Sequence, residues 1–205
     1  MLILVRHAAT RANVSEPYVL QGLRPDSALV PEGRRQARAV AEVLRHCSAV
    51  KAYCSPLKRA LQTARPIARS LGVSLEVEDA LLEADTGRWT GLSWPEIRER
   101  WPDECKAFEK DAERHGYLGG ESLAQVRDRI LPAMEGLVAR HTGQALVVVG
   151  HGVANRVLLA HWLGLPLRYA RQIPQDNGAF SVVEFRAAVG RVRTINTLAP
   201  SPLAA

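Results

Sequence analysis

The stretch LILVRHA at residues 2–8 decides the fold. Its first four residues are apolar or β-branched, which is typical of a strand buried on both faces of a sheet. Arg6 and His7 follow at once, where turn residues are usual. Because open α/β sheets bind ligands at the carboxyl ends of their strands, this order predicts a charge and a titratable ring at a ligand-binding edge. Taken alone, the pair could equally lie on the surface at the start of a helix.

A second buried run, ALVVV at residues 145–149, also leads into a histidine. His151 lies between Gly150 and Gly152, and glycines there indicate close backbone approach or φ angles that other residues avoid. If the two strands are parallel neighbours, His7 and His151 lie at one edge of the sheet, so we predict that both rings belong to one site. The other histidines occur at helix ends or within helices, and we expect them to be structural: His46, His115, His141 and His161.

Strand-like and helix-like stretches alternate along the chain. We expect strands over residues 2–5, 50–54, 75–77 and 145–149, and an antiparallel hairpin over 180–185 and 191–195 with its turn at 188–190. Helical spacing predicts helices over 32–46, 57–71, 95–101, 103–114, 122–141 and 152–163. Pro66 is expected to bend its helix or to end a first segment of it, and Pro132 is expected to bend its helix. This rhythm predicts an α/β fold: a single-domain three-layer α/β/α sandwich with a mostly parallel sheet and an antiparallel edge strand. The domain is expected to span residues 1–198, before a loose tail at 199–205.

Length and composition are those of one ordinary globular domain. The chain has 205 residues, of which 47% are hydrophobic and 23% charged. No run approaches the roughly 20 apolar residues of a membrane-spanning helix, and no leader precedes the first strand. We therefore expect a cytoplasmic protein with no membrane partner. The widely spaced Cys47, Cys54 and Cys105 indicate reduced thiols and give no support for a zinc site.

The net charge of +6 raises the question of a nucleic-acid partner. The basic residues are scattered among acidic ones and form no run of five. We therefore expect no nucleic-acid binding, and an anionic small molecule fits the excess positive charge better.

Two further stretches place charged side chains after expected strands. In SPLKRALQTA, residues 55–64, Arg59 lies in a first helical turn, where the helix dipole favours anions; an ordinary surface cation is the alternative. In LLEADTGRWTG, residues 81–91, Glu83 and Asp85 follow two leucines in a glycine-punctuated loop. A carboxyl group just beyond a buried segment is a candidate proton donor.

Taken together, these motifs resemble the histidine phosphatase superfamily, also called the phosphoglycerate mutase-like fold. Two positions depart from the family pattern: Ala8 replaces the glycine of its Arg-His-Gly signature, and Ala9 replaces a common acidic residue. The matching blocks run in family order from residue 2 to about 185: RHA with Thr10 and Asn13, LQGLRPDSALVPEGRRQA at 20–37, SPLKRALQTA, EADTGRWTG at 83–91, GGESLAQVRDR at 119–129 and VVVGHGV at 147–153.

The resemblance implies a metal-independent phosphomonoesterase that acts on a small phosphorylated metabolite through phosphohistidine. It makes His7 the nucleophile, with a hydrogen bond from its other ring nitrogen to a backbone carbonyl fixing the tautomer. Glu83 is the expected general acid and then base, with Asp85 as the alternative. Arg6, Arg59 and a protonated His151 would bind phosphate oxygens. The resemblance adds four further binding residues: Asn13, Gln21, Gly22 and Gly152.

No metal and no cofactor is expected, because three cationic groups take the place of magnesium. Two other functions stay open: a phosphoglycerate mutase, which usually has an aromatic residue where this chain has Thr86, and a non-catalytic phospho-ligand binder. A homodimer is possible. We expect the loops at 17–24, 104–120 and 176–180 to set specificity. Trp89, Phe108 and Tyr117 are candidates to wall the pocket, with a packing role as the alternative.

Overall fold

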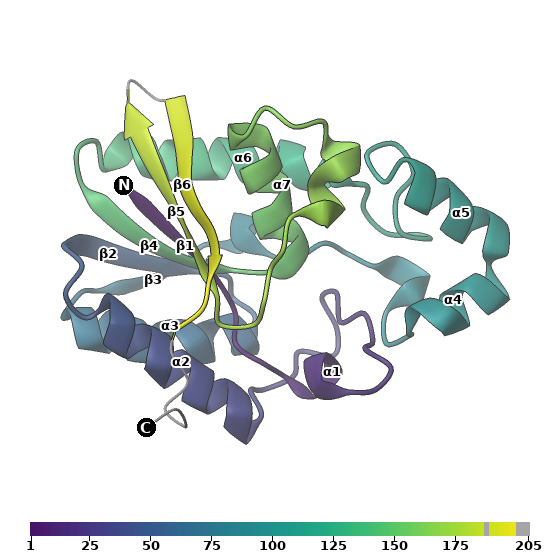
Figure 1. Cartoon of the computed structure of the whole chain (residues 1–205), viewed down its shortest axis with the longest axis horizontal. Coiled ribbons are helices and arrows are strands. Elements are labelled where there is room, and N and C mark those ends of the chain that lie inside the picture. Colours follow the sequence, from purple (N-terminus) through teal and green to yellow (C-terminus); the bar gives the residue numbers. More distant parts are fainter. Residues whose placement is uncertain (187–188, 200–205) are drawn as a thin grey trace.

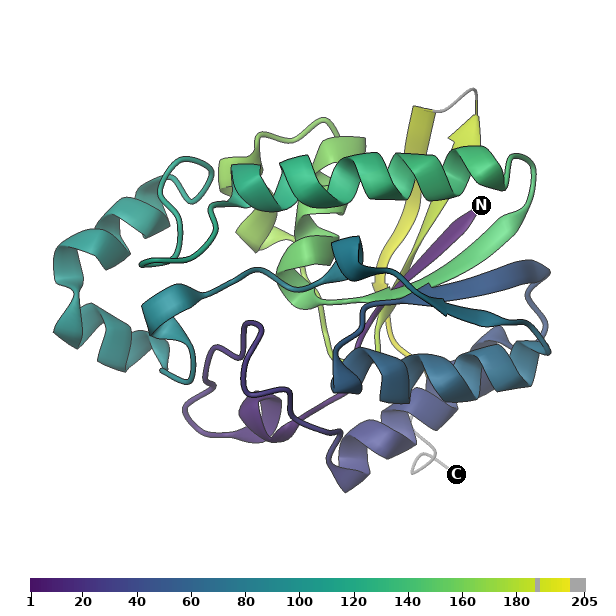
Figure 2. The same cartoon turned by 180° about the vertical axis from the view of Figure 1, so that it is seen from behind.

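A computed structural model of the chain describes residues 1–186 and 189–199. Six strands form one sheet in the order β3-β2-β4-β1-β5-β6, with helices on both faces (Figures 1 and 2). The strands are β1 (Leu2–Arg6), β2 (Ala49–Cys54), β3 (Leu75–Val77), β4 (Ala145–Gly150), β5 (Phe180–Arg186) and β6 (Val189–Thr197). The α-helices are α1 (Arg11–Val14), α2 (Pro31–Leu44), α3 (Lys58–Leu71), α4 (Trp94–Arg100), α5 (Pro102–Lys110), α6 (Leu123–Arg140) and α7 (Gly152–Trp162). Three short 3-10 helices are η1 (Asp79–Leu81), η2 (Gly87–Trp89) and η3 (Leu167–Gln172).

The central strands β1 and β4 are parallel neighbours, in a register that pairs Arg6 with Gly150. β2 and β3 continue the parallel part, whereas β5 and β6 are antiparallel at the other edge. The predicted three-layer α/β fold with an antiparallel edge is therefore confirmed. Because β1 and β4 point the same way, the residues that follow them leave the sheet at the same edge.

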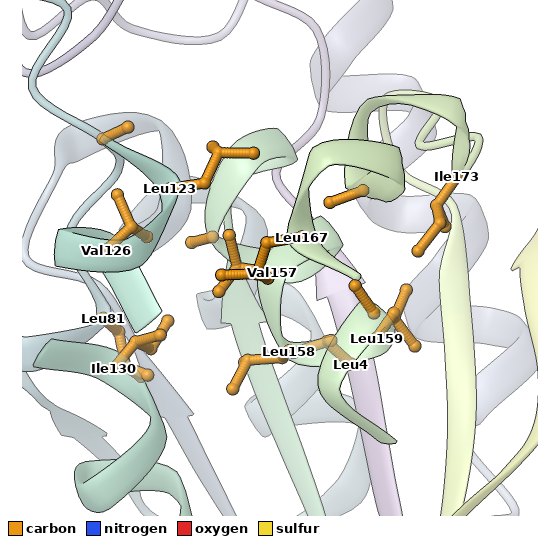
Figure 3. Close-up of a cluster of buried hydrophobic side chains, with 14 of the residues drawn as sticks. Leu4, Leu81, Leu123, Val126, Ile130, Val157, Leu158, Leu159, Leu167 and Ile173 are labelled. Atoms are coloured by element: carbon orange, nitrogen blue, oxygen red, sulfur yellow. The ribbon is translucent and has the colours of Figure 1, made fainter. Parts of the chain in front are cut away.

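Alternation along β1 divides its side chains between two cores. Ile3 and Val5 pack with α2 and α3, whereas Leu2 and Leu4 pack with α6 and α7. Figure 3 shows the second core, in which Leu4 lies beside side chains of α7. Both faces of the central strands are thus covered, as their continuous apolar runs predict.

Helices α4 and α5 lie beyond the edge of the sheet where β1 and β4 end (Figure 1). An aromatic cluster connects α4 and α5 to the rest of the molecule, and its ring centroids lie 4.6–6.0 Å apart. It consists of Trp89, Trp94, Phe108 and Tyr117. Trp89 and Phe108 are fully buried, so packing is their role.

Pro66 and Pro132 lie inside α3 and α6, and neither ends its helix. Of the two outcomes expected at Pro66, a division of the helix is wrong, and the bends expected at Pro66 and Pro132 stay predictions. A proline inside a helix costs about 3 kcal/mol, but buried neighbours such as Ile67 and Ile130 hold the turns on either side against the cores. Gly190 belongs to β6 instead of the expected turn, and Ala188 lies outside the described residues.

The expected tail at 199–205 lies outside the described residues except for Ala199, which packs against the core of α2 and α3. The domain boundary at residue 198 therefore stays a prediction. In the described part of the chain, no helix is both long enough and apolar enough to span a membrane. Cys54 is fully buried in β2, and burial raises the pKa of its thiol to about 12.

Candidate active site

His7 and His151 follow the neighbouring strands β1 and β4, and their ring centroids lie 5.2 Å apart. The backbone N–H of His7 donates to the carbonyl of Gly150 at 2.9 Å, which extends the pairing of the strands past Arg6. Both side chains are almost completely buried. The structure thus brings together the two rings that the strand ends predict to share a site.

The ring of His7 has a defined tautomer. Its Nδ1 lies 2.8 Å from the carbonyl oxygen of Ala8, which can only accept, so Nδ1 carries the proton and Nε2 has a free lone pair. Burial, and then the positive charges of Arg59 and Arg6, hold the pKa of His7 well below its ordinary value. His7 is therefore a neutral imidazole with one nucleophilic nitrogen.

His151 has no hydrogen-bond partner on either ring nitrogen among the described residues, although it is fully buried. Burial, followed by the charge of Arg59 and the neighbouring His7, lowers its pKa well below the ordinary value. Buried polar atoms are nearly always paired, so the ring of His151 has hydrogen-bonding capacity that the described residues do not use.

Arg6 and Arg59 add three more unpaired donors. Arg6 donates from Nη1 to the carbonyl of Gln175, while its Nε is buried without a partner in the described chain. Arg59 is 1% exposed and donates from Nη2 to Gly22, at 2.7 Å, whereas its Nε and Nη1 form no hydrogen bond with any described residue. The nearest carboxylate, Asp26, lies 4.0 Å from Nη1. A buried guanidinium without a bonded counter-ion is costly unless an anion joins it.

Two amide side chains near these arginines are fixed by Thr10. The Asn13 Oδ1 atom accepts from the backbone N–H of Thr10 at 3.0 Å and lies 2.8 Å from its hydroxyl. The same hydroxyl lies 3.0 Å from Gln21 Oε1, and Gln21 Nε2 is buried with no described partner. Both amides therefore have their acceptor ends occupied, which leaves their N–H ends as donors.

Gly22 occupies a position that only glycine fits. Its φ is +53°, and a Cβ there would lie 2.3 Å from the hydroxyl of Thr86. The close approach aims the Gly22 carbonyl at Arg59 and so orients that guanidinium.

Glu83 reaches into the site from the loop after η1. Its Oε1 accepts from the backbone N–H of Ala154 at 3.1 Å, and its Oε2 accepts from Val153 at 3.2 Å, both in the first turn of α7. Asp85 instead accepts from the backbone of Gly87, at 2.9 Å, and shapes the loop. The geometry therefore favours Glu83 over Asp85 as the carboxyl group of the site.

Arg129 and Glu121 hold the Glu83 loop in place, and no role was expected for either. Arg129 donates to the carbonyls of Ala80, Leu82 and Glu83 and forms an ion pair with Glu121 at 3.0 Å. Glu121 in turn accepts from the backbone N–H of Asp85 at 2.8 Å. Both residues lie in the matched block at 119–129, and this match is the feature of the sequence that could have identified them.

Seven of the nine predicted site residues line a small cavity that we call the histidine cavity, and His151 and Gly152 do not line it. It is lined by Arg6, His7, Asn13, Tyr18, Leu20, Gln21, Gly22, Arg59, Glu83, Thr86, Tyr117 and Val153. Gly152 does not line it, but a Cβ on Gly152 would lie 3.3 Å from Arg6 Nε, so its small size makes room for that guanidinium.

A second cavity of about 240 Å³, the arginine cavity, shares Arg6 and several walls with the first. It is lined by Arg6, Tyr18, Leu20, Trp94, Tyr117, Leu123, Val153, Arg156, Ala170 and Arg171. The sequence did not single out Arg156 or Arg171, although Arg156 follows Gly152 by one helical turn, and that spacing could have suggested it.

The three loops expected to set specificity contribute unequally. The loop at 17–24 supplies Tyr18 and Leu20, and the loop at 104–120 supplies Tyr117. The segment 176–180 lines neither cavity; its Asn177 donates to the carbonyl of His7 at 3.0 Å. Among the described residues, no three or more His, Cys, Asp or Glu side chains are grouped so that they could hold a metal ion.

Residues 2–198 match the histidine phosphatase superfamily (branch 1). The chain belongs to this superfamily. The match covers nearly the whole sequence and confirms the resemblance that the motifs indicate. Several relatives of this histidine phosphatase are named phosphatases, which confirms the predicted enzyme class, a phosphoric monoester hydrolase.

Three similar proteins illustrate the relationship. Phosphoserine phosphatase 1 of Hydrogenobacter thermophilus is 35% identical over 89% of this chain and 85% of its own. A metal-independent phosphoserine phosphatase of Arabidopsis thaliana is 37% identical over 77% of this chain and 66% of its own. The structure of a mycobacterial glucosyl-3-phosphoglycerate phosphatase has a TM-score of 0.85 and 28% identity, covering 97% of this chain and 99% of its own. Other relatives are longer: the chain spans 53% of a bifunctional protein of Mycobacterium tuberculosis, at 30% identity.

Proposed function

We propose that this histidine phosphatase is a metal-independent phosphomonoesterase that hydrolyses a small phosphorylated metabolite through a phosphohistidine on His7. The observation that carries the proposal is the set of buried donors without partners around the two rings. These donors belong to Arg6, Gln21, Arg59 and His151. A phosphate group has enough acceptor oxygens to bind all of them, and it supplies the negative charge that the arginines lack.

In the first step, the free Nε2 of His7 attacks phosphorus and forms a P–N bond while the ester P–O bond breaks. The leaving alcohol oxygen takes a proton from Glu83, which is held at this point by the backbone of α7. Arg6 and Arg59 stabilise the negative charge on the phosphoryl oxygens, which is the main task of a phosphoryl-transfer site.

In the second step, the Glu83 carboxylate takes a proton from water, and the water oxygen attacks phosphorus. The P–N bond breaks, its electron pair returns to His7 Nε2, and inorganic phosphate leaves. The hydrogen bond from Nδ1 to Ala8 keeps the ring in the same tautomer in both steps.

His151 changes its protonation when phosphate binds. The causes that lower its pKa are burial and positive neighbours, and a phosphate dianion beside the ring acts in the opposite direction. The expected imidazolium therefore forms with the phosphate complex, and phosphate binding takes up a proton.

Two guanidinium groups and the His151 imidazolium supply the positive charge that magnesium gives in many other phosphoryl-transfer enzymes. A relative named metal-independent phosphoserine phosphatase supports the same view for this chain.

Hydrolysis of p-nitrophenyl phosphate in excess EDTA tests the proposal, with His7→Ala as the inactive variant and the exposed His161→Ala as the matched control. We expect full turnover by the wild type and His161→Ala, and none by His7→Ala. Tight phosphate binding without turnover would instead support a phospho-ligand binder. Isomerisation of phosphoglycerate stimulated by a bisphosphate would support a mutase.

A further inference from the structure

The arginine cavity carries three guanidinium groups, from Arg6, Arg156 and Arg171, and no carboxylate lines it. Proposed catalysis at His7 uses Arg6 for the scissile phosphate, so two of these positive charges have no part in the chemistry described so far. Their distribution around one cavity suggests a purpose in substrate binding.

Arg156 is half-buried on α7 and is held by one backbone contact. Its Nε donates to the carbonyl of Ile173 at 2.8 Å, which leaves its two terminal nitrogens without a hydrogen bond or ion pair to any described residue. Burial, followed by the charge of Arg6, lowers the pKa of Arg156. An incoming anion beside the two free terminal nitrogens would stabilise the charged guanidinium.

Arg171 is exposed, but aromatic rings fix its position. Its guanidinium carbon lies 4.7 Å from the ring centroid of Trp94 and 5.0 Å from that of Phe108. Cation–π contacts of this kind orient a guanidinium group and leave the N–H groups in its own plane available for hydrogen bonds. Arg171 has no ion pair with a carboxylate of the described chain.

The two cavities are close enough for one small molecule to reach both. A methyl group placed on Gly152 would lie 3.3 Å from Arg6 Nε and 3.6 Å from Arg156 Nη1, so these guanidinium groups flank the same point. Tyr18, Tyr117 and Val153 line both cavities and form a continuous wall. A skeleton of a few carbon atoms can therefore hold its phosphate at His7 and another group at Arg156.

We propose that Arg156 and Arg171 bind a second anionic group of the substrate, so that the preferred substrates are small phosphomonoesters that also carry a carboxylate or a second phosphate. This inference rests on the proposed function and specifies its substrate class. The shared chemistry is a negatively charged oxygen group a few bonds from the scissile ester, since a guanidinium fork recognises either anion.

The test compares kcat/KM within two matched pairs of esters. The first pair is 3-phosphoglycerate and glycerol 3-phosphate, in which a carboxylate is replaced by a hydroxymethyl group. The second pair is propane-1,3-diol bisphosphate and its monophosphate. In at least one pair, we expect kcat/KM to be about tenfold or more higher for the ester with the additional anionic group, which is 3-phosphoglycerate in the first pair and the bisphosphate in the second. This factor corresponds to one charge-assisted hydrogen bond. A preference in the first pair alone assigns a carboxylate, and one in the second pair alone assigns a phosphate.

The variants are Arg171→Gln and Arg156→Gln, with Arg168→Gln as the control on the same short helix η3. Arg168 is exposed and lines neither cavity. We expect Arg171→Gln to reduce the preference about fivefold, chiefly through KM, and Arg168→Gln to leave it unchanged. Arg171 is exposed, so Arg171→Gln decides the question even if Arg156→Gln does not fold.

Two results would overturn the inference and leave the proposed function standing: hydrolysis of all four esters without preference, or a preference that survives in Arg171→Gln. A wild-type protein that hydrolyses none of the four esters and no p-nitrophenyl phosphate would overturn both proposals.

Discussion

The rings of His7 and His151 lie 5.2 Å apart because the strands that precede them are parallel neighbours in register. The same arrangement buries both rings beside two guanidinium groups, and the pKa of each ring is well below its ordinary value. The strand order thus creates both a nucleophilic imidazole and a positively charged place for phosphate.

Stability should depend on pH through these two histidines. Their folded-state pKa values lie below the ordinary value of about 6.5, so the unfolded chain binds more protons in acid. The contribution of the neutral rings is fully present above about pH 6.5 and is lost as the pH falls below it. We expect the Tm of the phosphate-free protein to fall between pH 7.5 and 5, measured by calorimetry, and to fall less steeply in His151→Gln. Identical slopes for the two proteins would contradict this.

Arg59→Met separates activity from stability. The variant loses two donors to the phosphoryl oxygens, and we expect kcat/KM to fall about 10²–10³-fold, as for removal of one oxyanion donor. It also removes a buried charge without a bonded carboxylate, so the Tm should not fall. Kinetics and thermal unfolding of the same preparation check both parts. A variant that keeps its activity, or loses it only because it unfolds, would be inconsistent with a phosphate-binding role.

The loss of activity in Glu83→Gln should depend on the leaving group of the substrate. p-Nitrophenolate leaves readily without a proton, whereas the alkoxide of a glycerol or serine ester needs one. We expect the loss in the rate of the first step to be about 10²-fold or more for alkyl phosphates and much smaller for p-nitrophenyl phosphate. Asp85→Asn is the control, because Asp85 bonds to Gly87 instead of the site. Equal losses for both leaving groups would argue against proton donation by Glu83.

Arg129 is a positioning residue, since it touches the Glu83 loop but lines neither cavity. Arg129→Met should lower kcat/KM, which reports the first step, about tenfold for alkyl phosphates, with a smaller effect for p-nitrophenyl phosphate, because misplacing Glu83 weakens proton donation to the leaving group. Arg129→Lys restores the charge but not the fork of donors and should recover only part of the rate. A uniform loss for all substrates would show that Arg129 only stabilises the fold.

The strands and the two histidines could be predicted because each depends on a short local pattern. The apolar runs before Arg6 and Gly150 require burial on both faces, and that fixes where the chain leaves the sheet. Arg59 was predictable for a similar reason, since a helix begins directly after β2.

The arginine cavity could not be predicted, because its walls come from distant elements. Trp94 belongs to α4, Arg156 to α7 and Arg171 to η3, and no local pattern states that these elements meet. The contacts of Arg129 and Glu121 with the Glu83 loop could not be predicted for the same reason, because they depend on how α6 packs against η1. Tertiary packing also explains why α3 continues through Pro66, where an end of its first segment was one of the two expected outcomes.

Formation of phosphohistidine on His7 is tested most directly by mass spectrometry of Glu83→Gln mixed with p-nitrophenyl phosphate and quenched in alkali. The first step proceeds in this variant because its leaving group needs no proton, while the second step lacks its base, so the phosphoenzyme accumulates. We predict an alkali-stable, acid-labile phosphate on His7. Turnover without a phosphorylated protein, or a phosphate on His151 instead, would contradict this prediction.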